Sequence, residues 1–211
     1  MLPMKKAVLW DFGGVILSSP FEAFRRFESD HGLPTDFIRG VNATNPSSNA
    51  WALMERSEIS AGQFEKLFAK EAAALGHRVR GSDVLALLAG AIRPEMVEML
   101  DRVKEAGLLV ACLTNNIVDP GSAGNDRAAE IADIMARFDV IVESSKVGVR
   151  KPEPRFYEIA CELLGVRPQE CVFLDDLGIN LKPAAAMGMT TIKVTSAAQA
   201  IADLSRALGL Q

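Results

Sequence analysis

The chain has 211 residues, of which 49% are hydrophobic and 24% are charged, a balance typical of a folded globular protein with a sizeable core. Its net charge of −4 argues against binding to nucleic acid or to an anionic membrane. No apolar run approaches the length of a membrane span and the start lacks a signal-peptide core, so we expect a cytoplasmic protein.

The first predicted element is a short buried strand, Ala7 to Trp10. It is followed by a long region, residues 17–92, in which no strand-like run occurs. Helices are predicted there at residues 21–29, 35–41, 50–56, 61–75 and 82–88, with a polar loop at 42–49. An all-helical unit is therefore inserted directly after the first strand.

The remainder of the chain alternates between strands and helices. A helix is predicted from Pro94 to Gly107, because proline favours a helix start and glycine a helix end. A second helix is predicted at residues 154–164, and a polar loop at 119–126. Strands are predicted at 108–113, 140–142, 171–174 and 190–194.

This alternation predicts an α/β fold with a doubly wound, Rossmann-like parallel sheet. We expect residues 1–16 and 93–211 to form the core domain and residues 17–92 to form a helical cap domain. Ligands of such sheets bind beyond the carboxyl ends of the strands, where the candidate catalytic residues of this chain fall.

Three cysteines, Cys112, Cys161 and Cys171, give an odd count. Two lie in apolar runs and the third lies in a helical pattern. We expect reduced thiols in the core, in preference to disulfides or a metal site.

Carboxylates end two of the predicted strands. Asp11 is followed by Phe12-Gly13-Gly14, whose glycines let the backbone approach a ligand, so Asp11 is a candidate nucleophile or metal ligand; a carboxylate that caps a turn is the alternative. Asp175 and Asp176 are adjacent and repel each other unless a cation offsets their charge. Mg²⁺ suits such oxygen ligands, and an acidic surface turn is the alternative.

Two further segments could bind an anion. Thr114 and Asn115 end the second strand of the core, where a hydroxyl and a backbone N–H could hold phosphate oxygens, although both residue types also cap helices. Lys151 precedes Pro152, which stiffens the segment and would help to aim the ammonium group at a dianion. An isolated lysine is more commonly solvated, so Lys151 is a candidate anion-binding residue only if the other candidate residues lie at the same site.

The order of these elements carries a family resemblance. An aspartate at the first strand end, a threonine at the second, a later Lys-Pro and an Asp pair at a fourth strand end resemble the haloacid dehalogenase superfamily, in its subgroup with an α-helical cap. The tracts at residues 147–154, 173–178 and 180–183 look like the phosphatase domain of soluble epoxide hydrolases. They are also similar to the domain fused to some acyl-CoA dehydrogenases, as is the tract at 11–15.

This resemblance implies a hydrolase that binds Mg²⁺ as its cofactor and a small-molecule phosphate ester as its partner. Asp11 would attack phosphorus to form an aspartyl-phosphate, with Thr114, the Asn115 backbone and Lys151 binding the phosphoryl oxygens. The metal would be held by Asp11, by Asp176, through water by Asp175, and by the carbonyl of Gly13. The resemblance leaves open whether the protein is a monomer or a homodimer.

One position departs from the phosphatase pattern. The family places a second aspartate, a general acid and base, two residues after the nucleophile, and here that residue is Gly13. Loss of such a group typically costs about 10²–10⁴ in rate. Three alternatives follow: a phosphatase with an easy leaving group or a substitute acid, a 2-haloacid dehalogenase, or a weakened binding module.

The insert contains two kinds of residue relevant to these alternatives. Glu22 and Glu55 are carboxyl groups that could substitute for the missing acid, although the sequence does not place either of them in the site. Six of the ten phenylalanines and Trp51 also lie in the insert, and their helical spacing favours packing between helices over a substrate pocket. An organic or lipid-like ester would be favoured if some of these rings line the cleft.

Overall fold

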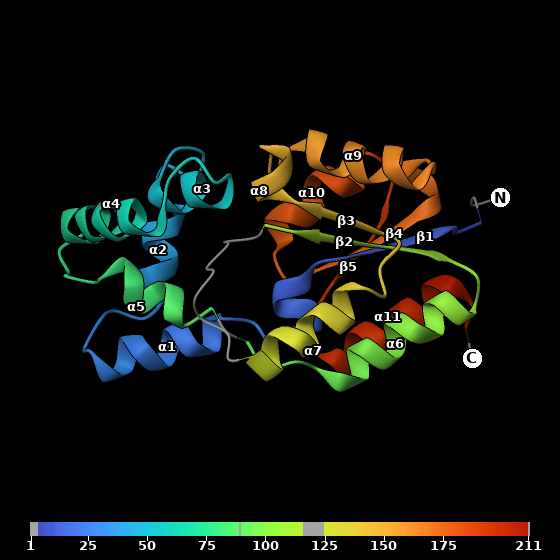
Figure 1. Ribbon diagram of the computed structural model, residues 1–211, viewed down its shortest axis with the longest axis horizontal. Coiled ribbons are helices and arrows are strands. Elements are labelled where there is room, and N and C mark those ends of the chain that lie inside the picture. The colour runs from blue at the N-terminus through green and yellow to red at the C-terminus, as the bar shows by residue number, and fades with distance from the viewer. Residues whose placement is uncertain (1–3, 89, 116–124, 211) are drawn as a thin grey trace.

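A computed structural model describes residues 4–88, 90–115 and 125–210. Its centre is a parallel five-stranded sheet in the order β3-β2-β1-β4-β5 (Figure 1). The strands are β1 (Ala7–Trp10), β2 (Leu109–Thr114), β3 (Val140–Glu143), β4 (Cys171–Asp175) and β5 (Thr190–Lys193). The fold class predicted from the sequence is confirmed; the bounds of β1 are as expected, and the ends of the other strands differ from the expected ones by at most one residue.

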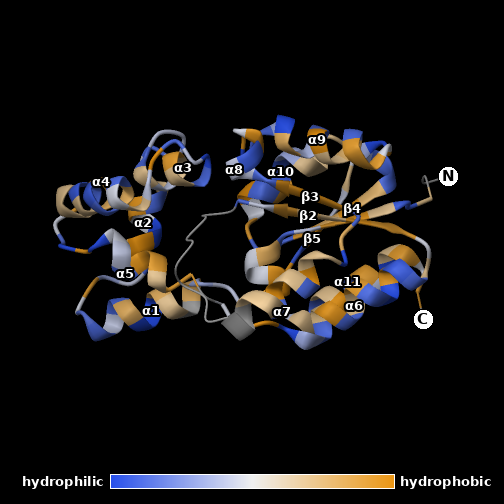
Figure 2. Ribbon diagram, in the orientation of Figure 1, coloured by the Kyte–Doolittle hydropathy of each residue, from blue (hydrophilic) through white to orange (hydrophobic). Residues whose placement is uncertain are grey.

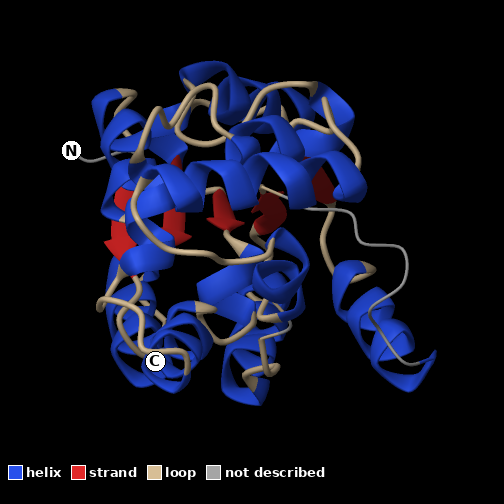
Figure 3. Cartoon of the chain, turned by 90° about the vertical axis from the view of Figure 1, so that its left-hand side faces the viewer, coloured by secondary structure: helices blue, strands red, loops and turns tan. Residues whose placement is uncertain are grey.

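Helices cover both faces of this sheet, and Figure 3 shows them above and below the strands. One face carries α6 (Pro94–Glu105), α7 (Asn125–Met135) and α11 (Ala197–Leu208). The other face carries α8 (Ser144–Val147), α9 (Pro154–Leu164) and α10 (Gly178–Ala186). The loop predicted at 119–126 lies largely outside the described residues, and its last two residues open α7.

The alternation of side chains along β1 divides the core into two layers. Val8 and Trp10 pack with α6 and α11 on one face, whereas Ala7 and Leu9 pack with α9 on the other. Figure 2 shows the apolar strands between the two helical layers. The central strands are buried on both faces, as predicted, but the edge strand β3 is not, since Ile141 is 38% exposed.

The region after β1 is helical, as predicted. It contains α1 (Phe21–Asp30), α2 (Phe37–Ala43), α3 (Ala50–Glu55), α4 (Ala61–Ala74) and α5 (Gly81–Ala86). Side chains start two of these helices: Asn49 accepts a hydrogen bond from the Ala52 N–H, and Ser60 forms a capping box with Gln63. The helices enclose an apolar cluster of their own around Phe64 and Phe68.

The chain leaves the core for these helices and returns to it at one place. Leu17 and Ile92 form an antiparallel bridge. Beside it, the Ser18 N–H donates to the Ala91 carbonyl at 2.7 Å and the Arg93 N–H donates to the Ile16 carbonyl at 2.9 Å. The paired segments lie where the sequence places the boundaries of the cap at 16/17 and 92/93, and those boundaries stay a prediction.

Two further expectations concern the chain as a whole. Cys112, Cys161 and Cys171 are buried and free, as expected of thiols in the core. Among the described residues, no helix has the length and apolar character needed to cross a membrane.

Candidate active site

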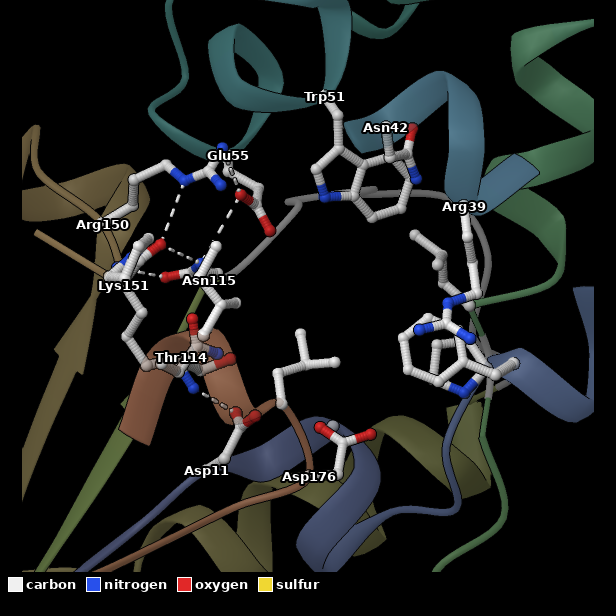
Figure 4. Close-up of a pocket in the computed structure, with 18 of the residues that line it drawn as sticks. Asp11, Arg39, Asn42, Trp51, Glu55, Thr114, Asn115, Arg150, Lys151 and Asp176 are labelled. Carbon is white, nitrogen blue, oxygen red and sulfur yellow. Dashed lines mark hydrogen bonds and ion pairs between the residues drawn. The ribbon is translucent and has the colours of Figure 1, made fainter. Parts of the chain in front are cut away.

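The candidate residues converge at the carboxyl edge of the sheet. Asp11 follows the central strand β1, whose neighbours are β2, ending at Thr114, and β4, ending at Asp175. Trp10 is in register with Cys112 on one side and Leu174 on the other, so the three strand ends lie level with one another. Figure 4 shows Asp11, Thr114, Lys151 and Asp176 around the same cavity.

Lys151 connects two of the carboxylates. Its Nζ lies 2.7 Å from Asp11 Oδ1 and 2.8 Å from Asp175 Oδ2, and only 1% of its side chain is exposed. Burial by itself lowers the pKa of this ammonium group, but the two carboxylates more than compensate and raise its pKa overall. Lys151 therefore remains charged, and it is not an isolated solvated lysine.

Asp175 is fully buried, and protein groups bind both of its oxygens. The Leu177 N–H donates to Oδ1 at 2.8 Å, and Asn180 Nδ2 lies 3.1 Å from Oδ1 and 3.0 Å from Oδ2. Tyr157 in turn donates to the Asn180 carbonyl at 2.7 Å. These contacts favour a role for Asp175 in holding Lys151 in place over direct contact with a metal ion.

Asp176 is positioned differently, beside the turn that follows β1. Ser19 Oγ donates to its Oδ2 at 3.0 Å. Gly14 has a φ of +82°, and a Cβ atom there would lie 2.3 Å from the Asp176 carboxylate. Only glycine allows this close approach, because any side chain would overlap the carboxylate and would be strained at this φ.

The acidic cluster fits a divalent cation. One oxygen each from Asp11, Asp175 and Asp176 can be chosen so that all lie within 4.8 Å of one another. Burial raises the pKa of Asp11 and of Asp176, and the neighbouring carboxylates raise both further. A hard cation with oxygen ligands would offset this repulsion, so the donor set and its charge suit Mg²⁺.

Asn115 holds the backbone of Lys151. Its Oδ1 accepts from the Lys151 N–H at 2.9 Å, and its Nδ2 donates to the Lys151 carbonyl at 3.0 Å. The side chain is thereby committed to protein contacts. A phosphate contact from Asn115 would have to come from its backbone, as the sequence resemblance implies.

Above these residues lies a cavity of about 680 Å³ between the sheet edge and the helices of residues 17–92. The floor of the cavity, on the sheet edge, contains Asp11, Gly13, Thr114, Lys151 and Asp176. The roof, on the helical region, contains Phe21, Phe24, Arg39, Asn42, Trp51 and Glu55. Among the aromatic residues, Phe64 and Phe68 pack inside the helical region, whereas Phe21, Phe24 and Trp51 line the cavity, so both interpretations of the aromatic residues hold in part.

Glu55, at the end of α3, contacts the core. Its Oε2 lies 2.9 Å from Arg150 Nη1 and 3.5 Å from Asn115 Nδ2, and its backbone carbonyl accepts from Ser144 Oγ. Burial raises the pKa of Glu55 to about 7, although the charge of Arg150 opposes the shift. The side chain of Glu22, the other candidate acid, lies outside the described residues.

Gly13 leaves an open place beside Asp11. A Cβ atom at Gly13 would meet nothing within 4 Å. The backbone there, with φ −73° and ψ 129°, suits any residue. Steric and backbone constraints therefore do not explain why a glycine stands where the resembling phosphatases have an aspartate.

Sequence reasoning assigned no role to two groups that order this site, Asn180 and Ser19. Asn180 lies five residues after Asp175, at the start of α10. A signal for it exists, since a buried carboxylate requires donors and the first turn of the following helix can supply them. Ser19 has no comparable signal, because its contact with Asp176 spans 157 residues.

Residues 5–188 match the haloacid dehalogenase-like hydrolase family. Bifunctional epoxide hydrolase 2 of Mus musculus is 32% identical over 98% of this chain and 39% of its own length. Acyl-CoA dehydrogenase family member 10 of Mus musculus is 32% identical over 97% of this chain and 19% of its own length. The chain thus spans about two fifths, or less, of these relatives.

Dehalogenases are also among the relatives. (S)-2-haloacid dehalogenase 4A of Burkholderia cepacia is 31% identical over 48% of this chain and 42% of its own length. Among solved structures, a HAD family enzyme of Bacteroides thetaiotaomicron, in complex with magnesium and inorganic phosphate, superposes with a TM-score of 0.58. It is 18% identical and covers 90% of this chain and 93% of its own, a similarity of fold.

Proposed function

The chain belongs to the haloacid dehalogenase-like hydrolases, and within that family we propose that it is a Mg²⁺-dependent phosphatase acting on a small organic phosphate ester. One observation carries the proposal: Asp11 lies on the floor of the cavity, bound to a buried Lys151 and next to Asp176. A nucleophile, a fixed cation and a divalent metal site are the parts that phosphoryl transfer requires.

Asp11 is the nucleophile in this proposal. Its Oδ1 accepts from Lys151 Nζ and from the Phe12 N–H, at 2.7 Å each, which holds the carboxylate in one orientation. The other oxygen then attacks phosphorus, and an aspartyl-phosphate forms that water later cleaves. Holding the nucleophile in place before substrate binds lowers the barrier, because less conformational entropy is lost on reaching the transition state.

Lys151, Thr114 and the Asn115 backbone bind the phosphoryl oxygens. Lys151 is kept in position by Asp175 and, through its own backbone, by Asn115. Asp11, Asp176 and the Gly13 carbonyl would hold Mg²⁺, with Asp175 contributing through water. When bound, the ion supplies positive charge that offsets the repulsion between the carboxylates and the phosphate.

A 2-haloacid dehalogenase is the second candidate. Gly13 favours it, because the acid–base aspartate of the phosphatase pattern is missing at this position. The partial similarity to (S)-2-haloacid dehalogenase 4A favours it as well. The cluster of three carboxylates weighs against it, because substrate carboxylates would be repelled unless a cation were present. A weakened binding module is the third alternative, and it predicts ligand binding without turnover.

The test is hydrolysis of p-nitrophenyl phosphate by the wild-type chain, with Mg²⁺ and with EDTA, beside Asp11→Asn. We expect turnover that requires the metal and falls by about 10³-fold or more in the variant. The nitrophenolate leaves without protonation, so Gly13 does not prevent this reaction. An undiminished rate in Asp11→Asn would refute the nucleophile. If no phosphate is released, chloride release from 2-chloropropionate separates a dehalogenase from a binding module.

A further inference from the structure

Glu55 is a buried carboxyl group in the roof of the cavity, and the proposed chemistry has not yet used it. Only 8% of its side chain is exposed, although it comes from the helical region and not from the core. The helix α3 ends at this residue, and the Ser144 hydroxyl donates to its backbone carbonyl. Glu55 is thus held against the core from both its backbone and its side chain.

Phosphoryl transfer defines where a leaving group must be. The attacking and leaving oxygens lie roughly in line on opposite sides of phosphorus. Asp11 attacks from the floor, so the leaving oxygen faces the roof, which is where Glu55 lies (Figure 4). Figure 4 also shows that one carboxylate oxygen of Glu55 faces Arg150 and Asn115, whereas the other points toward the cavity.

We propose that Glu55 is the general acid and base of the reaction, in place of the aspartate that Gly13 lacks. This inference rests on the proposed phosphatase function. In the first step Asp11 forms a bond to phosphorus, the ester P–O bond breaks, and the proton of Glu55 moves to the leaving oxygen to give an alcohol. In the second step the Glu55 carboxylate takes a proton from water, the water oxygen bonds to phosphorus, and the bond between phosphorus and the Asp11 oxygen breaks. Phosphate leaves, Asp11 is a carboxylate again, and Glu55 is again protonated.

The surroundings of Glu55 suit both steps. Among the described residues, the charged groups Arg150 and Lys151 act on Glu55, and both favour its carboxylate, as do hydrogen bonds from Trp51 and Asn115. Burial opposes them and is the larger effect, so the pKa of Glu55 is about 7. A carboxyl group with this pKa can both give and take a proton near neutral pH.

The test compares three phosphate monoesters with leaving groups of increasing basicity: p-nitrophenyl, phenyl and benzyl phosphate. In Glu55→Gln we expect kcat/KM for benzyl phosphate to fall by about 10²–10⁴, and to fall far less for p-nitrophenyl phosphate. The wild-type kcat/KM for benzyl phosphate should decline above pH of about 7, where Glu55 loses its proton, and the variant should lack this decline. Glu58→Gln, an exposed neighbour paired with Arg56, is the matched control and should behave as wild type.

A second variant separates proton transfer from packing. A Cβ atom at Gly13 would meet nothing within 4 Å, so Gly13→Asp should be tolerated and return a carboxyl group beside Asp11, and we expect it to restore benzyl phosphate hydrolysis in the Glu55→Gln background. An equal loss on all three esters, without this rescue, would overturn the role of Glu55. If Glu55→Gln fails to fold, the wild type decides: a steep fall in rate from p-nitrophenyl to benzyl phosphate overturns the inference, and a shallow one supports it.

The failure of the inference and that of the proposed function look different. Wild-type turnover of p-nitrophenyl phosphate with a uniform loss in Glu55→Gln removes only the role of Glu55. The absence of wild-type turnover on every ester, with Mg²⁺ present, removes the phosphatase itself and the inference with it.

Discussion

The floor and the roof of the cavity are built from different chemistry. The floor is charged, and its groups bind one another: Lys151 contacts Asp11 and Asp175, and Asp176 contacts Ser19. The roof combines three aromatic residues, Phe21, Phe24 and Trp51, with Arg39, which stacks on Phe21, and with the buried Glu55. If the proposed function is right, the strand ends supply the nucleophile, the buried cation and the metal site, whereas the inserted helices supply the proton donor Glu55 and the surface that contacts the organic part of a substrate.

The largest effect is expected on the floor, from Lys151→Met. This change leaves Asp11 and Asp175 buried beside each other without their cation. We expect the free energy of unfolding to fall by about 3–5 kcal/mol. Phosphatase turnover should fall by about 10²–10³-fold. Urea denaturation and phosphate release measure the two effects, and a stable, active variant would contradict the account of the floor.

The next effect is the pH dependence of stability caused by Glu55. Burial raises its pKa to about 7 in the folded protein, so between about pH 4.5 and 7 the folded state keeps a proton that the unfolded state has lost. The wild type should therefore lose roughly 3 kcal/mol relative to Glu55→Gln as pH rises through this window, and the difference should level off above it. Urea denaturation of both proteins from pH 4.5 to 8 tests this, and a constant difference would contradict it.

A smaller effect distinguishes two adjacent glycines. Gly14→Ala places a methyl group 2.3 Å from the Asp176 carboxylate at a φ of +82°, so Asp176 must move. We expect a loss of about 1–3 kcal/mol of stability and a weaker apparent affinity for Mg²⁺ in activity titrations. Gly13→Ala is the matched control, because its methyl group would meet nothing within 4 Å. Equal effects of the two changes would argue against the proposed metal site.

The smallest effect is expected in the roof. Trp51→Ala removes an apolar wall of the cavity, which should raise KM about 10-fold more for esters with a large apolar group than for small ones. The variant also loses the hydrogen bond from Trp51 to Glu55, and this loss should affect large and small esters alike. Phe27→Ala is a suitable control, because this ring stacks on His31 of the same helical region. Steady-state kinetics with ethyl and naphthyl phosphates would measure the difference. Equal changes in KM for both esters would show that the roof does not select substrates.

The floor could largely be predicted from the sequence. Parallel strands all end at one edge of the sheet, so Asp11, Thr114 and Asp175 had to converge once the strands were recognised. The separate roles of Asp175 and Asp176 could not be predicted in the same way. Successive residues at a strand end point in different directions, so one carboxylate is buried against Asn180 and the other faces the turn at Gly14.

The roof was less predictable. The existence of its helices follows from periodicity, but which side chains face the cavity depends on how the helices pack on one another and on the core. Glu55 illustrates this, because its contact with Asn115 joins residues 60 positions apart and its contact with Ser144 joins residues 89 positions apart. No local pattern in the sequence encodes such pairings.

The bridge between Leu17 and Ile92 has a consequence for how this architecture can vary. Because the outgoing and returning segments lie side by side, the chain connects the helices between them to the core at one place, and the contacts of Glu55 add a second attachment through side chains. A short turn could join the two segments without moving any strand. The same attachment would accept an exchanged set of helices, so substrate preference could change while the residues at the strand ends stay the same, provided that the new helices again place a carboxyl group where Glu55 lies.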